Sequence, residues 1–250
     1  MRILTMLMAL MLGLLTVPGE ENSSLAKKNG YVINLDRAEK LEKMTYSSLF
    51  SKAGIIVLED TDESLLGKVD KLEVCDNNLY VLEKGRGLFL FNKQGKFIKM
   101  IGRQGKGPGE YIDPDDISID RENKKIYVLD SQTQNVLKYS GNGTFESSFK
   151  LENKGTRSTF IQPFKNALYT NLYTFDKSGK RFLLSKVDVT NGKRISFQFE
   201  ASQYNKGWNE LFSTDQHTFI SGPTGNPKFM QIFMDTIFEI TPKGIKPYIT

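Results

Sequence analysis

The sequence predicts an all-β fold built from repeated four-stranded antiparallel units, and two observations support this class. First, from Ile55 onward the apolar residues follow a period of two and are rich in β-branched side chains, which is typical of strands. Second, residues 71–83 (KLEVCDNNLYVLE) and 116–130 (DISIDRENKKIYVLD) repeat one pattern: an alternating strand, a polar turn and a second strand that ends in an acid.

The repeat continues beyond these two strands. Residues 88–91 (LFLF), followed by NKQGKF, correspond to residues 136–139 (VLKY), followed by SGNGTF. Each unit therefore supplies four strands in about 45 residues, a spacing typical of a β-propeller blade. Weaker copies follow at residues 167–195 and 217–249, so we expect about four blades.

The composition suits a folded domain, with 39% apolar and 25% charged residues. The formal net charge is +5, but acidic and basic residues alternate along the chain, so we expect no nucleic-acid partner. The chain has one cysteine, Cys75, and one histidine, His217, which excludes a disulfide framework and a zinc cluster made of these residue types alone.

The N-terminus is typical of a secretory signal, because Arg2 precedes an apolar stretch from Ile3 to Val17. We expect cleavage after Gly19, with an uncleaved N-terminal anchor as the alternative. No cysteine stands near the end of the apolar stretch, so a lipoprotein is not expected, and no stable transmembrane span should remain after cleavage. The expected location is the periplasm or the cell surface.

The remaining chain divides into a linker and one β-propeller domain. The linker covers residues 20–30, and the domain covers residues 31–250. Within the domain we expect a lead-in at 31–66 and approximate blades at 67–111, 112–157, 158–200 and 201–250. Asp36 could cap a short helix in the lead-in, between residues 36 and 50.

A glycine-rich segment joins the first two predicted blades. Its glycines are Gly102, Gly105, Gly107 and Gly109. It lacks the spacing of a phosphate-binding loop, and no helix follows it. We therefore expect a structural connector whose glycines permit positive φ, fixed in place by Glu110 and Tyr111.

Binding through the same connector is the alternative, because such loops are expected at the mouth of the central channel. The candidate binding residues are Arg103, Gln104, Lys106, Glu110, Tyr111 and, in a later polar loop, Trp208. Trp208 could stack on a sugar or peptide, or pack within the fold. A structural role is expected for Asp130, which ends a strand and can accept turn N–H groups.

The run LLGKVDKLEVCDNNLYVLEKGRGLFLFNKQGKFIKMIGRQGKGPGEY resembles the NHL-like six-bladed β-propeller family of exported Bacteroidetes proteins, most of them uncharacterised. Its most specific parts are GRQGKGPGEY, LED at residues 58–60 and DTIFEITPKGIKPYI at residues 235–249. The resemblance implies a C-terminally shortened, incomplete six-bladed ring. In such a ring Ile55–Glu59 would lack its ring-closing neighbours, and the open sheet edges would favour self-association.

Two functions remain open from the sequence. In the first, the protein is an exported, non-catalytic binding or scaffold module that recognises a glycan, peptide or protein through its loops, without a cofactor. In the second, it is a metal-dependent hydrolase or lactonase whose channel holds a divalent cation through oxygens of Glu110, Asp115 and Asp116. No residue is assigned a catalytic or metal-binding role, and a lone His217 is expected to be structural.

Overall fold

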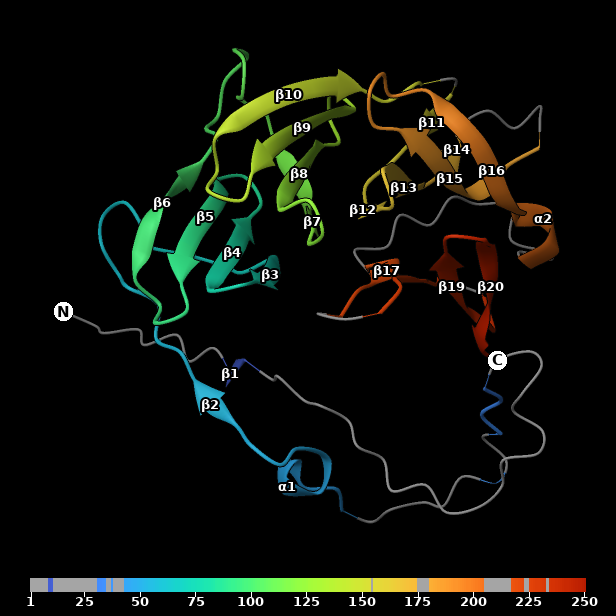
Figure 1. Ribbon diagram of the computed structural model, residues 1–250, viewed down its shortest axis with the longest axis horizontal. Helices are drawn as coiled ribbons and strands as arrows, with labels where there is room; N and C mark the ends of the chain where they lie inside the picture. The colour runs from blue at the N-terminus through green and yellow to red at the C-terminus, as the bar shows by residue number, and fades with distance from the viewer. Residues whose placement is uncertain are drawn as a thin grey trace.

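The computed structural model describes residues 9–10, 31–34, 37, 43–153, 155–174, 180–204, 217–222, 225–232 and 234–250 (Figure 1). Most of the predicted signal peptide, the linker at residues 20–30 and Trp208 lie outside the described residues. Predictions that concern those parts are therefore not tested by the fold.

Four antiparallel sheets of four strands each form the blades in the described part of the chain. Blade 1 comprises β3 (Lys71–Cys75), β4 (Asn78–Glu83), β5 (Gly87–Asn92) and β6 (Phe97–Ile101). Blade 2 comprises β7 (Pro114–Asp120), β8 (Lys125–Asp130), β9 (Asn135–Ser140) and β10 (Phe145–Lys150). These two sheets correspond to the two clearest copies of the sequence repeat.

The other two blades come from the weaker copies. Blade 3 comprises β12 (Ile161–Phe164), β13 (Ala167–Asn171), β15 (Phe182–Asp188) and β16 (Arg194–Glu200). Blade 4 comprises β17 (Phe219–Ile220), β18 (Lys228–Phe229), β19 (Ile237–Thr241) and β20 (Gly244–Ile249). A separate pair, β11 (Thr156–Arg157) with β14 (Tyr173–Thr174), adjoins blade 3, and α2 (Ala201–Tyr204) follows β16.

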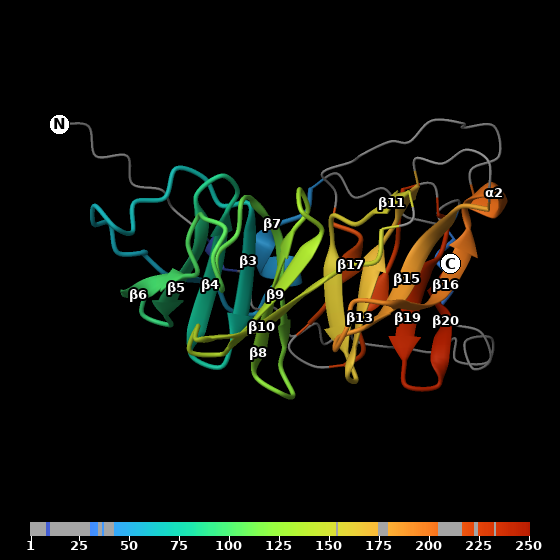
Figure 2. The same ribbon diagram turned by 90° about the horizontal axis from the view of Figure 1, so that it is seen from above.

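The blades stand side by side along an arc, with β3, β7, β12 and β17 on its inner side (Figures 1 and 2). Each sheet runs in chain order from its inner strand to its outer strand. The predicted all-β propeller of about four four-stranded blades is therefore confirmed.

Apolar side chains on both faces of the middle strands hold neighbouring blades together. In β8, Ile126 and Val128 pack in the layer between blades 1 and 2, whereas Tyr127 and Leu129 pack in the layer between blades 2 and 3. Successive side chains of a strand point to opposite faces, so a strand between two blades needs a continuous apolar run. The motif IYVL meets this need.

The lead-in differs from its predicted form. The strand expected over Ile55–Glu59 is reduced to β2 (Gly54–Ile55), which pairs with β1 (Ala9–Leu10). From Ile56 the chain instead covers the outward face of blade 1, where Ile56 and Leu58 pack against buried side chains of β4 and β5. These contacts bury an apolar sheet face that has no blade beside it.

Hydrogen bonds fix this covering segment, residues 56–60, to the turn between β5 and β6. The Glu59 N–H donates to the Gly95 carbonyl at 2.7 Å, and the Phe97 N–H donates to the Glu59 carboxylate at 2.9 Å. Gly95 has φ 83°, and a Cβ there would lie 2.0 Å from the Val57 carbonyl oxygen. The open edge expected at Ile55–Glu59 is therefore occupied by contacts within the chain.

The start of the lead-in pairs with the far end of the arc. The Tyr31 N–H donates to the Tyr248 carbonyl at 2.7 Å, and the Thr250 N–H donates to the Tyr31 carbonyl at 2.8 Å. This parallel contact covers the outer edge of β20. One stretch of chain thus contacts both end blades.

In the region of the helix predicted between residues 36 and 50, the described residues contain the short helix α1 (Tyr46–Leu49), whose N-cap residue is Thr45. Asp36, the predicted cap, lies outside the described residues. The side chains of Met44, Tyr46 and Leu49 remain exposed, so the helix has no apolar partner. Isolated helical turns are marginal without such packing, which explains its length.

Candidate functional site

The glycine-rich connector spans residues 102–113, between β6 and β7, and it is built around the side chain of Tyr111. This ring is 1% exposed. Its hydroxyl donates to the Ile101 carbonyl at 2.9 Å and accepts the Leu88 N–H at 3.2 Å. Burial raises the pKa of Tyr111. Tyr111, predicted both to fix the loop and to contact a ligand, thus points into the core and leaves no ring surface for a ligand.

Two of the four glycines have the left-handed backbone that favours glycine. Gly102 has φ 68° and Gly109 has φ 74°. A Cβ on Gly102 would lie 2.6 Å from the Tyr139 hydroxyl oxygen, and one on Gly109 would lie 2.8 Å from Cγ of Phe145. Both positions therefore need glycine for conformation and for space.

The other two glycines serve a different purpose. Gly105 and Gly107 do not have positive φ, contrary to the expectation for Gly107. A Cβ on Gly105 would instead lie 2.0 Å from the Glu110 carboxylate. The absence of side chains lets Glu110 fold back over the loop.

Glu110 closes the connector through hydrogen bonds. Its carboxylate accepts the Gly107 N–H at 2.8 Å and the Arg103 Nε–H at 2.6 Å. The backbone N–H of Gly107, followed by Arg103, lowers the pKa of Glu110. Gln104 is tied down as well, because its side chain donates to the Gly85 carbonyl at 2.9 Å.

Two cationic side chains project from this fixed loop. The Arg103 side chain is 79% exposed even though Glu110 holds its Nε. Lys106 is exposed, and its ammonium has no ion pair within the described residues. In Figure 1 the segment between β6 and β7 extends from the outer side of the arc, away from the inner strands. The connector thus presents its charges at the rim, whereas the mouth of the channel was expected.

Asp130 lies at the base of the connector and is 2% exposed. Its carboxylate accepts the Ile112 N–H at 2.8 Å and the Thr133 N–H at 3.1 Å. These bonds join the end of β8 to the end of the connector. The structural role predicted for Asp130 rests on these contacts.

A second polar cluster lies on the inner strands and was missed from the sequence. Asp116 of β7 is fully buried, and its two oxygens contact Lys71 Nζ at 2.7 Å and the Ile161 N–H at 2.8 Å. Arg121 lies 3.1 Å from Glu73 of β3. The sequence does contain a signal for this cluster: because successive side chains of a strand point to opposite faces, Lys71 and Glu73 lie on the same face of the innermost strand. This cluster links three blades.

The carboxylates proposed to hold a cation do not converge. Asp116 is engaged by Lys71 and the Ile161 N–H, and Asp115 accepts hydrogen bonds from Ser131. Glu110 is held in the connector. Among the described residues no group of three or more His, Cys, Asp or Glu side chains is placed to hold a metal ion. The oxygen set of the hydrolase alternative is therefore wrong.

His217 precedes β17 and makes an edge-on ring contact with Phe160 at 5.1 Å between centroids. Desolvation, followed by the charge of Lys71, lowers the pKa of this imidazole, while Asp116 opposes the effect. The His217 ring lies beside the polar cluster of the inner strands, close enough to Lys71 and Asp116 to sense both charges.

The blades, the buried inner cluster and the fixed connector define a β-propeller protein. The chain belongs to the family described as domain of unknown function DUF4934, whose family model matches residues 30–250. The NHL-like six-bladed ring stays a prediction. Neither helix in the described part of the chain has the length and apolar character needed to cross a membrane.

Three solved structures are similar to the chain. A Bacteroides fragilis protein described as a "putative exported protein" has TM-score 0.61 and 22% identity, over 78% of this chain and 54% of that protein. A Staphylococcus aureus virginiamycin B lyase has TM-score 0.46 and 14% identity, over 80% and 60%. A Bacteroides vulgatus member of the DUF4221 family has TM-score 0.45 and 9% identity, over 70% and 59%.

The similarity to the Bacteroides fragilis protein supports the fold alone. The chain spans about half the length of the Bacteroides fragilis protein. No curated protein matches the sequence.

Proposed function

We propose that this protein is an exported, non-catalytic binding module that recognises a glycan, peptide or protein partner through the connector at residues 102–113. The observation that carries the proposal is the exposure of Arg103 and Lys106 on a loop held by hydrogen bonds of Glu110 and of the buried Tyr111. A loop already fixed in one conformation loses little entropy when it binds. The connector combines this rigidity with accessible charge.

The proposal is tested by screening the purified protein against glycan and peptide arrays. The double variant Arg103→Ala/Lys106→Ala should lose most of the signal on at least one set of glycan or peptide features that the wild type binds. The matched control is Lys150→Ala/Lys193→Ala, which removes two exposed lysines away from the connector and should bind normally. Equal loss in both double variants would show only a general charge effect, and undiminished binding in the first would place the site elsewhere.

Export is the second part of the proposal. It rests on Arg2, the apolar stretch Ile3–Val17 and the structural similarity to a protein described as exported. Intact-mass measurement of protein from the periplasmic or surface fraction should show the loss of residues 1–19. A chain that keeps its N-terminus in a membrane fraction would contradict this.

We also expect no bound metal cation, because the carboxylates of Asp116, Asp115 and Glu110 already accept hydrogen bonds from other groups of the protein. Elemental analysis after dialysis should find no stoichiometric divalent metal. A retained cation would favour the hydrolase or lactonase alternative and would require a ligand set different from Glu110, Asp115 and Asp116.

A further inference from the structure

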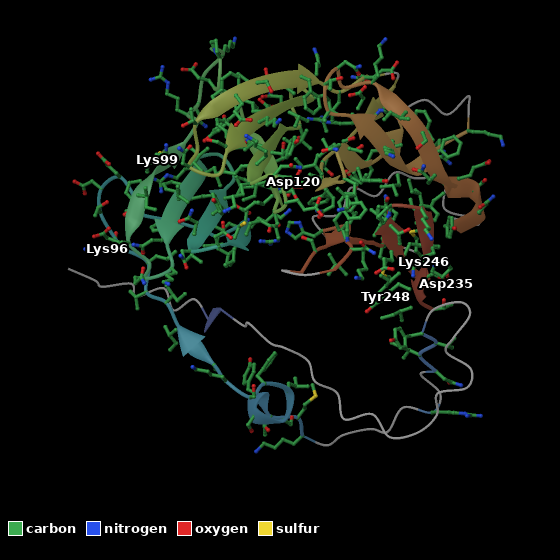
Figure 3. The ribbon with its side chains drawn as sticks, viewed as in Figure 1. Lys96, Lys99, Asp120, Asp235, Lys246 and Tyr248 are labelled. Atoms are coloured by element: carbon green, nitrogen blue, oxygen red, sulfur yellow. The ribbon has the colours of Figure 1, made fainter. Side chains whose placement is uncertain are left out.

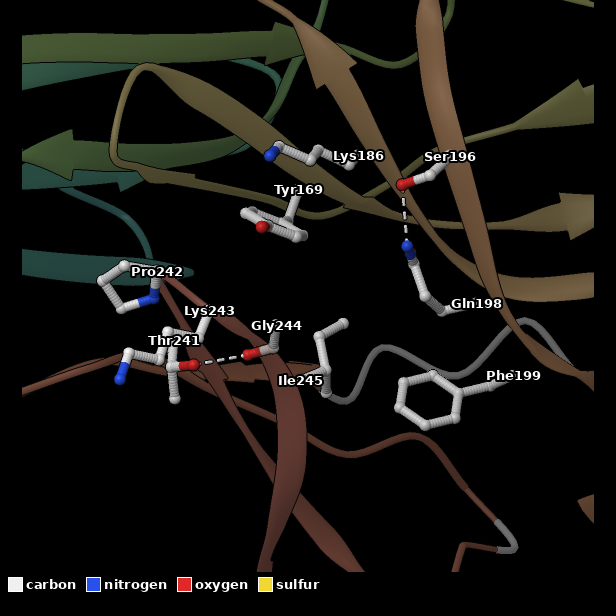
Figure 4. Close-up of a pocket in the computed structure, with 10 residues that line it drawn as sticks. All are labelled: Tyr169, Lys186, Ser196, Gln198, Phe199, Thr241, Pro242, Lys243, Gly244 and Ile245. Carbon is white, nitrogen blue, oxygen red and sulfur yellow. Dashed lines mark hydrogen bonds between the residues drawn. The ribbon is translucent and has the colours of Figure 1, made fainter.

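A cleft of about 530 Å³ lies between blade 3 and the turn that joins β19 to β20 (Figure 4). Its volume is in the range of small-ligand sites. Tyr169, Lys186 and Ser196 line one wall as direct cross-strand neighbours on β13, β15 and β16. The turn at Pro242 and Lys243 lies opposite. The register of blade 3 therefore fixes the polar groups of this wall.

Among the described residues that line the cleft, the charged side chains are all cationic: Lys186 and Lys243 are present, and no Asp or Glu is. Within the described residues neither lysine has an ion pair. Lys186 is half-buried, so solvent screens its charge less than that of a fully exposed lysine. Two unpaired cations without a carboxylate beside them favour an anionic ligand.

Two further polar atoms of the cleft lack partners in the described part of the chain. The Tyr169 hydroxyl has no hydrogen bond, although the residue is only 6% exposed. Gln198 donates from Nε2 to Ser196 at 2.7 Å, but its buried Oε1 accepts nothing. After a small rotation of this amide toward the cleft, Oε1 could accept a hydrogen bond from a hydroxyl group of a ligand. That bond would remove the free-energy cost of a buried acceptor without a donor.

One end of the cleft is apolar, and its backbone has an unusual conformation. Phe199 and Ile245 lie together at one end, away from the Lys186 ammonium (Figure 4). Phe199 has φ 59°, a left-handed backbone that phenylalanine rarely adopts. Its ring packs on Phe238 at 4.4 Å and on Phe229 at 5.6 Å between centroids. Backbone strain that the core holds in place is common at ligand sites.

We propose that this cleft binds an acidic saccharide. The carboxylate of a sugar acid pairs with Lys186 and Lys243. A sugar hydroxyl donates to Gln198, the Tyr169 hydroxyl donates to the ligand, and the apolar face of the sugar ring packs on Phe199 and Ile245. A sugar acid supplies an anion, several hydroxyl donors and an apolar ring face in one residue, which matches the cleft wall. This site lies between blades 3 and 4, so it is separate from the connector between blades 1 and 2.

The test is calorimetric titration with short saccharides that end in galacturonic, glucuronic or N-acetylneuraminic acid. Each acid is paired with its carboxyl-reduced neutral analogue. The wild type should bind at least one acid, and its affinity for the neutral analogue of that acid should be lower by about tenfold or more. Its affinity for the acid should fall as the salt concentration is raised. Lys186→Gln and Gln198→Glu should each weaken that binding about tenfold or more, the second by placing a negative charge beside the ligand.

Two controls separate this site from other effects. Lys193→Ala removes an exposed lysine at the turn between β15 and β16, outside the cleft, and should bind as the wild type does. Arg103→Ala/Lys106→Ala should also keep acidic-saccharide binding, which distinguishes this site from the connector. Melting temperatures of all variants identify any loss caused by unfolding, and Tyr169→Phe gives a second cleft variant that removes only a hydroxyl.

Three results would overturn the proposal. The first is failure of every acid to bind, and the second is equal affinity for acids and neutral analogues. The third is tighter binding of a glutamate-rich peptide than of any saccharide, with the same loss in Lys186→Gln, which would assign the cleft to an acidic peptide.

Discussion

The Tyr139 hydroxyl donates a hydrogen bond to the Gly109 carbonyl at 3.0 Å, which joins the third strand of blade 2 to the connector that enters the blade. Tyr139 is 1% exposed, and Gly109 is buried as well. The bond holds the connector against the core without using any of its exposed cations. The stability of blade 2 and the shape of the connector are therefore coupled.

Gly109→Val should destabilise the protein by about 1–3 kcal/mol, because valine is strained at positive φ and its Cβ would collide with Phe145. Chemical denaturation of the wild type and the variant measures this difference. Gly54→Val is the control, since a Cβ on Gly54 meets nothing within 4 Å. Equal stabilities for the two variants would show that the connector is not constrained.

Tyr139→Phe should cost about 1–2 kcal/mol, because the buried Gly109 carbonyl loses its hydrogen-bond donor while the aromatic ring is kept. Tyr46→Phe removes the hydroxyl of a tyrosine that is 70% exposed and should change stability little. Thermal unfolding of both variants provides the comparison. A Tyr139→Phe protein as stable as the Tyr46→Phe protein would mean that this bond contributes nothing.

The free energy of unfolding should depend on pH through Glu73, which belongs to the polar cluster of the inner strands. Burial raises the pKa of Glu73 above its ordinary value, although Lys71 and Arg121 oppose the shift. A raised folded pKa contributes stability that is present at low pH and is lost as pH rises through that pKa. The unfolding free energy of the wild type relative to Glu73→Gln should therefore increase as the pH falls from 7 to 4.

Glu239 provides the opposite case for the same experiment. Desolvation acts to raise its pKa, but hydrogen bonds from Lys246 and Lys228 outweigh it and lower the pKa overall. Lys246 forms an ion pair with Glu239, and Figure 3 shows Lys246 and Tyr248 beside each other on blade 4. The wild type should lose stability relative to Glu239→Gln as pH falls below about 4.5. Slopes of the same sign in the two comparisons would contradict these environments.

Arg194→Met should destabilise blade 3 by about 2 kcal/mol, because its guanidinium donates to hydroxyls of Thr170, Ser185 and Ser158. Desolvation lowers the pKa of Arg194 to about 10, so the group stays charged at neutral pH. Denaturant titration compares this variant with Lys193→Met at the exposed neighbouring position. An equally small effect of both substitutions would show that the hydroxyl cluster does not depend on the arginine.

The blades could be predicted because their signal is local and repeated. The run IYVL at residues 126–129 is apolar at every position, which a strand between two packed sheets requires. The acids after each second strand, Glu83 and Asp130, likewise accept backbone N–H groups at the positions that the repeat indicates. Short-range pattern and chain spacing were sufficient for this level of structure.

The sites could not be predicted in the same way, because they depend on contacts between distant strands. The pairing of Lys71 with Asp116 joins two blades, and only the packing of the sheets brings the two groups together. Tyr111 looks like an exposed loop residue in the sequence, yet the preceding strand offers a carbonyl that draws its hydroxyl inward. The cleft wall at Tyr169 and Lys186 depends on strand register, which the weaker copies of the repeat leave undefined.

The contact between Tyr31 and β20 has a consequence for biosynthesis. Tyr31 leaves the ribosome roughly two hundred residues before its partner Ile249, so this edge cannot pair until the last strand has been made. The blades that form in between can fold as the chain emerges, whereas this parallel contact has the longest sequence separation in the sheet pairing and should form last. Until β20 has been made, Tyr31 therefore remains without this pairing partner.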